Sequence, residues 1–191
     1  MFGFNKISDN TPDELLMKFI AKGDRRAFEM LYNRYFEKLT WYAYGFVVEQ
    51  QRAEDIVQDV FVKVIERPQM FDETRKFSTW VYTVTANACR NAIRDEQNRA
   101  RLMREHIMPH HSTQVDIHHR ADYRILKDCI SSVFAELNEK EKNIYLLRFE
   151  QELSIKEVAA IMNIPEGSVK SGIYYLLRKF AYHLKDFTNG K

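Results

Sequence analysis

The stretch LSIKEVAAIMNIPEGSVKSGIYYLLRKF, residues 153–180, decides the fold of the second half of the chain. Ser154 followed three residues later by Glu157 has the pattern of a helix-capping box, and apolar residues then recur with helical spacing. The run Asn-Ile-Pro at 163–165 interrupts this spacing, and a second helix is predicted from Glu166. The stretch therefore predicts a helix-turn-helix whose second helix is free to lie in a major groove.

This second helix is predicted to have one buried and one solvent-facing side. The residues expected in the core are Val169, Ile173, Leu176, Leu177 and Phe180. Those expected to face solvent are Gly167, Ser168, Lys170, Ser171, Tyr174 and Arg178. A helical hairpin that only packs has the same spacing, but residues 165–191 carry five Lys and Arg against two acids, which favours a nucleic-acid partner.

The whole chain has the composition of a soluble globular protein, with 191 residues of which 45% are hydrophobic and 29% charged. Its formal net charge of +2 does not by itself indicate a nucleic-acid partner. Cys89 and Cys129 lack CxxC spacing, which favours a reducing compartment. No apolar run has the length of a signal peptide or a membrane span, so we expect a cytoplasmic protein.

Helical patterns also dominate the first half of the chain. Only 6 Gly and 4 Pro interrupt the sequence, and apolar residues recur at three and four positions, so the predicted fold is all-α. The first helix is expected at Pro12, with Thr11 and Glu14 as a capping box, and it is expected to end at Gly23. The other helices of this half are predicted from Asp24, at residues 52–66 and at residues 78–101.

A change in composition marks the predicted domain boundary. From residue 98 to about residue 120 the periodicity fades, and the segment is polar, rich in His and broken by Pro109, as in an exposed linker. Beyond it, helices are predicted at about residues 123–136 and from Asn138, where Glu141 completes a capping box. We therefore predict two small helical domains, residues 1–98 and 123–191, joined by a flexible linker at residues 99–122; the second domain contains the helix-turn-helix.

Polar and basic side chains share one face of the helix predicted at residues 78–101. They recur at i, i+3, i+4 and i+7 and can contact base edges and phosphates: Asn87, Arg90, Asn91 and Arg94. The residues ahead of this face are aromatic and basic, a mixture suited to holding a single strand by stacking: Arg75, Lys76, Phe77, Trp80 and Tyr82. In the alternative interpretation Phe77 and Trp80 are core residues, which accounts less well for Tyr82 and the polar face.

Residues 49–66 contain five acids against two bases. Asp55, Gln58 and Asp59 lie one helical turn apart, with Phe61 and Val62 beside them. A face of this charge repels DNA and suits a protein partner. The alternative is a solvated acidic surface without a partner.

Three segments, in this order, resemble the extracytoplasmic-function (ECF) sigma factors of bacteria: RAEDIVQDVFVKVIE at 52–66, KFSTWVYTVTANACRNAIRD at 76–95 and LNEKEKNIYLLRFEQELSIKEVAAIMNIPEGSVKS at 137–171. The match covers about residues 28–98 and 126–180. The resemblance implies a dissociable RNA polymerase subunit without catalytic chemistry or a cofactor. Such a subunit directs core polymerase to promoters, the first domain at the minus-ten element and the second at the minus-thirty-five element.

The resemblance also implies a role for each group of residues. The segment that binds the clamp helices of the polymerase largest subunit corresponds to Asp55, Gln58, Asp59 and Phe61. The promoter-melting segment corresponds to Phe77, Trp80, Tyr82 and Asn87, and the loop FDETRK at 71–76 is expected to hold a base turned out of the non-template strand. The minus-thirty-five recognition helix corresponds to Ser168, Lys170 and Ser171.

The chain departs from the family pattern at Gly172, Tyr174 and Tyr175, where a basic residue and a His-Arg pair are common. Together with Arg178, the tyrosines are expected to contact DNA with less dependence on charge and more on shape. The expected partners are core RNA polymerase, promoter DNA as duplex and as non-template single strand, and an anti-sigma factor, which is often membrane-anchored; no small-molecule substrate is expected.

Parts of the sequence also fit three other functions. An autonomous helix-turn-helix regulator would bind duplex DNA without polymerase, but it gives no account of Trp80. A metal sensor would use the linker histidines, which lack nearby Cys and a regular spacing: His106, His110, His111, His118 and His119. An enzyme is not expected, because the sequence shows no Gly-rich phosphate loop and no nucleophile with an adjacent base.

Overall fold

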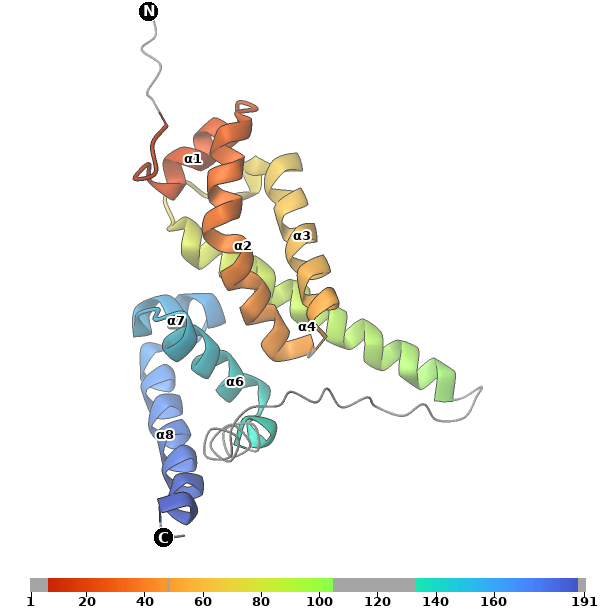
Figure 1. Cartoon of the computed structure of the whole chain (residues 1–191), viewed down its shortest axis with the longest axis vertical. Coiled ribbons are helices and arrows are strands. Elements are labelled where there is room, and N and C mark those ends of the chain that lie inside the picture. Colours follow the sequence, from red (N-terminus) through yellow and green to blue (C-terminus); the bar gives the residue numbers. More distant parts are fainter. Residues whose placement is uncertain (1–6, 48, 105–132, 189–191) are drawn as a thin grey trace, which may run out of the picture. The chain divides into compact units, whose positions relative to one another are not determined.

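The computed structural model of the chain describes residues 7–47, 49–104 and 133–188. Within these ranges the structure is helical and contains no β-strand, so the all-α prediction is confirmed. The chain divides into two compact units, unit 1 (residues 1–98) and unit 2 (residues 99–191), and each is described by itself (Figure 1).

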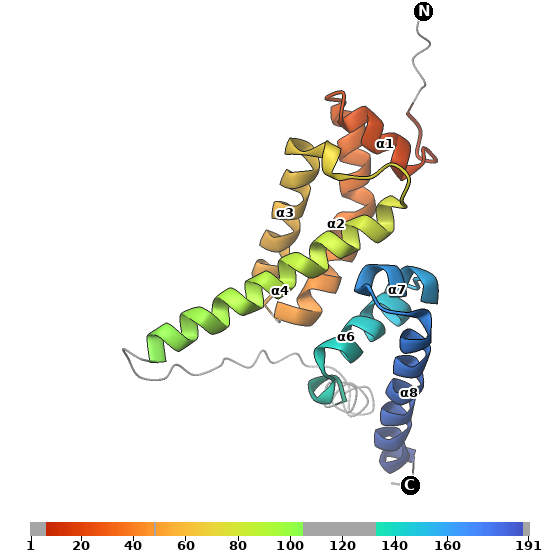
Figure 2. The same ribbon diagram turned by 180° about the vertical axis from the view of Figure 1, so that it is seen from behind.

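Unit 1 is built on a pair of helices crossed by a third. Its elements are α1 (Asp13–Ile20), α2 (Arg25–Val47), α3 (Gln50–Glu66), the 3-10 helix η1 (Pro68–Met70) and most of α4 (Phe77–Arg104). Helices α2 and α3 lie side by side in opposite directions, and α4 crosses both on one face (Figures 1 and 2). The fully buried side chains between them are large and apolar: Leu31, Leu39, Tyr42, Val57, Val60, Val64, Phe77 and Val81.

Polar bonds fix α1 against α2 and α3 against α4. Asp13 of α1 accepts from Arg34 at 2.5 Å and from the Tyr35 hydroxyl at 2.5 Å. Arg52 of α3 donates to the carbonyl oxygen of Ala92 on α4 at 3.0 Å. These bonds satisfy partly buried groups that would otherwise destabilise the fold.

The first predicted capping box is wrong. Pro12 is the N-cap of α1 and makes no side-chain cap bond. The Thr11 hydroxyl instead accepts from the Ser8 N–H at 2.9 Å, and the Glu14 carboxylate accepts from the Phe77 N–H at 2.9 Å. Glu14 therefore caps a different helix, α4, a pairing that local sequence spacing does not reveal.

Unit 2 contains a helical turn at residues 133–136, α6 (Glu139–Tyr145), the π-helical segment η2 (Leu146–Glu150), α7 (Ile155–Met162) and α8 (Glu166–Thr188). Both capping boxes predicted here are confirmed, Asn138 with Glu141 and Ser154 with Glu157. Asn163 ends α7 in the left-handed region at φ 52°. Most of the helix predicted at residues 123–136 lies outside the described residues, as do all five linker histidines.

Predicted helix limits in unit 1 differ from the structure by up to three residues; α1, for example, ends at Ile20 and not at Gly23. Helix α3 begins two residues before the predicted position 52, and α4 continues to Arg104, beyond the predicted end at residue 101. The residues beyond the predicted end are Leu, Met and Arg at 102–104, and all three favour helix. Loss of apolar periodicity therefore did not mark the end of this helix.

Candidate polymerase and nucleic-acid interfaces

The acidic side chains predicted on α3 form an exposed face. Asp55, Gln58 and Asp59 are all exposed, and the Gln51 amide donates to Asp55 at 3.3 Å. The apolar group among them is Val62, 48% exposed, followed one turn later by Ile65, 50% exposed. This acidic face can therefore offer both charge and apolar surface to a protein partner.

Phe61 is a correction to the predicted α3 site. Its side chain is 2% exposed and its ring meets Phe28 edge-on, with centroids 6.0 Å apart, and Tyr32 at 5.0 Å. Position 61 lies on the same side of the helix as the buried positions 57 and 64, whereas position 62 lies on the side of positions 55, 58 and 59. Helical periodicity was thus sufficient to assign Val62, and not Phe61, to the exposed face.

The loop at residues 71–76, between η1 and α4, has a defined internal structure. The Asp72 carboxylate accepts from the Thr74 hydroxyl at 2.7 Å and from the Thr74 N–H at 3.0 Å. These bonds hold the pKa of Asp72 below its ordinary value. Arg75, which pairs with Asp72 at 3.4 Å, and Lys76 are both exposed, as predicted for groups that meet a nucleic-acid backbone.

Two of the three aromatic residues predicted to stack on bases are core residues. Phe77 is fully buried, and Tyr82, 2% exposed, packs edge-on against Tyr42 with centroids 5.5 Å apart. Burial raises the pKa of the Tyr82 phenol. Trp80 is partly exposed and its ring lies 5.5 Å from Phe71 and 5.7 Å from Phe77, so it alone of the three offers surface to a base.

The polar face predicted on α4 is present. Asn87, Arg90, Asn91 and Arg94 are all exposed, and Arg90 donates to the Asn87 side-chain oxygen. The opposite side of the helix is buried and includes Cys89, 1% exposed. The two guanidinium groups and the two amides therefore share one exposed face of α4.

On α8 the predicted recognition residues are accessible to different degrees. Lys170, Ser171 and Arg178 are exposed, Tyr174 and Tyr175 are each 58% exposed, and Ser168 is partly buried. The Arg178 guanidinium lies over the Tyr174 ring at 5.8 Å. Leu177, expected in the core, is instead 52% exposed, because it lies on the same face as Tyr174 and Arg178.

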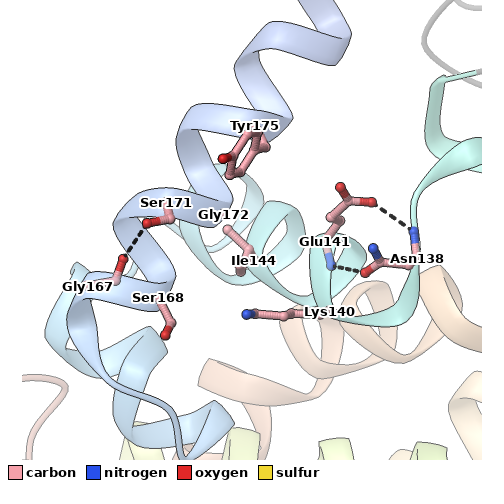
Figure 3. A pocket seen from close by; sticks show the side chains of 9 residues that line it. All are labelled: Asn138, Lys140, Glu141, Ile144, Gly167, Ser168, Ser171, Gly172 and Tyr175. Carbon is pink, nitrogen blue, oxygen red and sulfur yellow. Dashed lines mark hydrogen bonds between the residues drawn. The ribbon is translucent and has the colours of Figure 1, made fainter.

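Gly172 marks a close approach of α8 to α6. A Cβ at this position would lie 2.3 Å from the Cδ1 of Ile144, which is itself fully buried. Beside this contact lies a shallow cavity of about 380 Å³ between the two helices (Figure 3). Its lining residues are Asn138, Lys140, Glu141, Ile144, Gly167, Ser168, Ser171, Gly172 and Tyr175.

None of the described helices combines the length and apolar character that a membrane span requires. Within the described part of the chain, no group of three or more His, Cys, Asp or Glu side chains is placed to hold a metal ion.

Family comparisons match both units. The family model of Sigma-70 region 2 matches residues 31–99, and that of Sigma-70 region 4 matches residues 127–178. The chain belongs to the sigma-70 family. It is an RNA polymerase sigma factor, a transcription initiation factor, and its relatives place it in the ECF type.

Relatives of the sigma factor share its length as well as its regions. The ECF RNA polymerase sigma factor SigW of Bacillus subtilis is 26% identical, over 83% of this chain and 89% of the relative. The ECF RNA polymerase sigma-E factor of Escherichia coli is 24% identical, over 88% and 92%. The similarity to ECF sigma factors therefore covers most of the chain and is not limited to the three segments quoted from the sequence.

Solved structures show the same fold. CnrH, in complex with the cytosolic domain of CnrY, has a TM-score of 0.68 at 22% identity over 91% of this chain and 97% of CnrH. The sigma factor RpoE of Bartonella quintana, in complex with the anti-sigma factor NepR, has a TM-score of 0.64 at 18% identity over 83% and 96%.

Sequence reasoning missed two groups of the sigma factor that lie beside its predicted surfaces. Lys140 of α6 is exposed and lines the cavity next to Ser168 and Ser171 (Figure 3). Glu14 of α1 contacts the start of α4. Lys140 carries no local pattern, and the capping pattern of Glu14 indicates the wrong partner; only the packing of distant segments brings these side chains to the sites.

Proposed function

We propose that this sigma factor uses three separate surfaces, one for each macromolecular contact. The acidic face of α3 binds core polymerase, the 71–76 loop and the exposed face of α4 bind and help to open the minus-ten element, and the first half of α8 binds the minus-thirty-five element. The observation that carries the proposal is the exposed polar and basic face of α4, the same helix that carries the partly exposed Trp80. A DNA-binding domain that reads only duplex has no need of this second surface.

The charge of each surface fits its assigned partner. Asp55 and Asp59 repel phosphate and complement a basic polymerase segment. Arg90 and Arg94 attract the DNA backbone, while a base stacked on Trp80 contributes about 1 to 3 kcal/mol. Lys170, together with Lys140 next to Ser168 and Ser171, supplies phosphate contacts for α8, and Tyr174 and Tyr175 add apolar and hydroxyl groups.

The proposal extends to how the protein is regulated and to the compartment in which it acts. Two structures with this fold contain a second protein: CnrH is in complex with the cytosolic domain of CnrY, and the sigma factor RpoE is in complex with the anti-sigma factor NepR. We propose that a comparable anti-sigma factor covers these surfaces when the protein is inactive. Its work is carried out with polymerase in the cytoplasm and involves no catalytic chemistry of its own.

The test is promoter-dependent transcription with bacterial core polymerase, with and without the protein, on templates randomised at both promoter elements. We expect transcripts that require both proteins. DNA binding without any dependence on polymerase would instead show an autonomous regulator.

A paired substitution checks the assignment of α3 through the affinity of the protein for core polymerase, measured in a direct binding assay. Asp55→Lys should weaken binding to core polymerase by about tenfold or more, because it places like charge against the partner. Glu29→Lys, an equal charge change at an exposed position near the start of α2, is the control and should leave the affinity unchanged. Equal affinities for the two variants would contradict the assignment.

A further inference from the structure

The loop at residues 71–76 is held by α1, a helix that lies outside the region-2 match at residues 31–99. Glu14 accepts from the Phe77 N–H at 2.9 Å, and Lys18 pairs with Glu73 of the loop at 3.0 Å. Glu14 and Lys18 are four residues apart and therefore lie on the same face of α1. That face thus contacts both the loop and the first residue after it.

Helix α1 is itself firmly placed. Leu16 is fully buried and Met17 is 2% exposed, so the side of α1 away from solvent belongs to the core of unit 1. Asp13 binds both Arg34 and Tyr35 of α2, and the Tyr35 ring meets Phe77 edge-on with centroids 5.2 Å apart. Glu14 is therefore presented to Phe77 from a rigid support.

The Phe77 N–H needs a hydrogen-bond acceptor from outside α4. Phe77 is the first residue of α4, and the first N–H groups of a helix have no partner within the helix. A carboxylate there satisfies the donor and interacts favourably with the helix dipole. Because the Phe77 side chain is fully buried, water is a poor substitute for Glu14 at this position.

Both ends of the loop are fixed while its middle is free to meet a ligand. Phe71 at one end is 5% exposed and its ring lies 5.7 Å from that of Phe77 at the other end. The five residues between them, 72–76, are all exposed. The Glu14 bond and the Lys18–Glu73 pair are the contacts that α1 adds to this arrangement.

We infer that Glu14, assisted by Lys18, is a positioning residue that sets the loop for recognition of a minus-ten base. The inference rests on the proposed role of the loop. Ordering a flexible loop when a ligand binds costs free energy. A loop that is already held in its binding conformation avoids this cost when the correct base enters. A base that does not fit gains nothing from the ordered loop, so the support from α1 increases discrimination between bases.

The experiment measures base discrimination at the minus-ten element with the full chain and core polymerase, using templates that vary only there. Glu14→Ala should reduce the ratio of transcription on the preferred base to that on other bases by about five- to thirtyfold. Glu14→Gln keeps an oxygen acceptor and should reduce this ratio by less. Lys18→Ala should reduce the ratio by about twofold, because its ion pair is exposed. Lys22→Ala, at an exposed position just after α1, is the control and should change nothing.

Two further readouts separate positioning from general damage. Binding to core polymerase and base preference at the minus-thirty-five element should match the wild type in every variant. In Glu14→Ala the Phe77 amide proton should exchange with solvent faster than in Lys22→Ala, while amides at the centre of α3 keep their protection.

Unchanged discrimination in Glu14→Ala overturns the inference. If that variant does not fold, unchanged discrimination in both Glu14→Gln and Lys18→Ala overturns it as well. A wild-type protein that gives no polymerase-dependent transcripts overturns the proposed function itself, and the inference with it, so the two failures are distinguishable.

Discussion

At the residue scale, Gly172 shows how one missing methyl group determines a helix contact. A glycine inside a helix costs about 1 kcal/mol relative to alanine. Here the cost is offset by close packing, since the absent Cβ would overlap the Cδ1 of Ile144 at 2.3 Å. The sequence could indicate that position 172 was unusual, but only the packing shows that the reason is the neighbouring helix.

Gly172→Ala is expected to lower the free energy of unfolding of unit 2 by about 1 kcal/mol. Displacement of the buried Ile144 costs about 1 to 3 kcal/mol, of which the better helix propensity of alanine returns about 1 kcal/mol. Gly167→Ala, where nothing lies within 4 Å of the new Cβ, is the control and should not destabilise. Chemical denaturation measures both.

A second substitution tests the cause of this loss. Ile144→Val removes the Cδ1 atom that the new methyl group would meet, so Gly172→Ala should be less destabilising in that background than in the wild type. Strict additivity of the two changes would show that Ile144 is not the obstacle.

Lys170 provides a prediction for the charge of α8. Lys170→Ala should weaken binding to minus-thirty-five duplex and reduce the slope of log affinity against log salt by about 0.9, the value for one lost phosphate contact. Lys22→Ala removes the same charge from unit 1 and should leave the slope unchanged. A fluorescence anisotropy titration over a range of salt concentrations measures the slopes. An unaltered slope for Lys170→Ala would exclude a phosphate contact at this position.

At the element scale, local sequence patterns predicted the starts of α6 and α7 in unit 2 well and those of the helices in unit 1 less well. The two capping boxes of unit 2 are closed within four residues, so the pattern and the bond coincide. Glu14 fits the same pattern, but its carboxylate bonds to Phe77, 63 residues away. A capping pattern states which groups can bond, and tertiary packing decides which of them do.

Tertiary packing also decided which of the predicted site residues are exposed. Periodicity correctly placed the polar residues of α3 and α4 on exposed faces, because a polar side chain at a surface position needs no specific neighbour. Aromatic residues were harder to place, since a ring fits a core and a stacking surface equally well by composition. Phe61, Phe77 and Tyr82 were predicted at the sites and lie in the core, whereas Trp80 remains partly exposed.

Helix α6 carries a pH-dependent contact with α8. Glu141 lies 2.8 Å from the Lys179 amine and also accepts from the Asn138 N–H at 3.0 Å. Desolvation, the largest single effect, raises the pKa of Glu141, but the bonds from Lys179 and Asn138 together outweigh it and leave the pKa below its ordinary value. Because the folded-state pKa is the lower one, the resulting stability is present above the unfolded pKa and is lost as pH falls through the folded pKa.

Glu141→Gln should therefore lower the stability of unit 2 near neutral pH and make little difference at acid pH. The substitution keeps an oxygen that can cap α6 but removes the charge that Lys179 binds. Thermal denaturation of variant and wild type between about pH 7 and pH 3 measures the difference. A difference that stays constant over this range would show that the ionised carboxylate is not its source.

At the scale of the whole molecule, two compact units suggest two cooperative transitions. Each unit has its own buried core, with Leu31, Val57 and Phe77 in the first and Ile144, Leu147 and Val169 in the second. A core of its own is the condition for a unit to unfold by itself. The predicted division of labour, polymerase and minus-ten contacts in one unit and minus-thirty-five contacts in the other, is compatible with such independence.

Calorimetry of the intact chain should resolve these transitions through paired variants. Gly172→Ala is expected to lower only the melting temperature of the unit 2 transition. Val57→Ala leaves a cavity in unit 1 and is expected to lower only the melting temperature of the unit 1 transition. Equal shifts of a single transition by both variants would show that the units unfold together.

The distribution of tryptophan gives the protein a built-in optical reporter. The chain contains two tryptophans, Trp41 and Trp80, and both lie in unit 1. Trp41, 55% exposed, is stacked near Tyr44, while the Trp80 ring packs against Phe71 at the edge of the 71–76 loop. Emission excited at the red edge of the absorption band therefore arises from the N-terminal unit alone, and replacing Trp41 with phenylalanine leaves a single fluorophore beside the loop that signals the arrival of a DNA strand without any added dye.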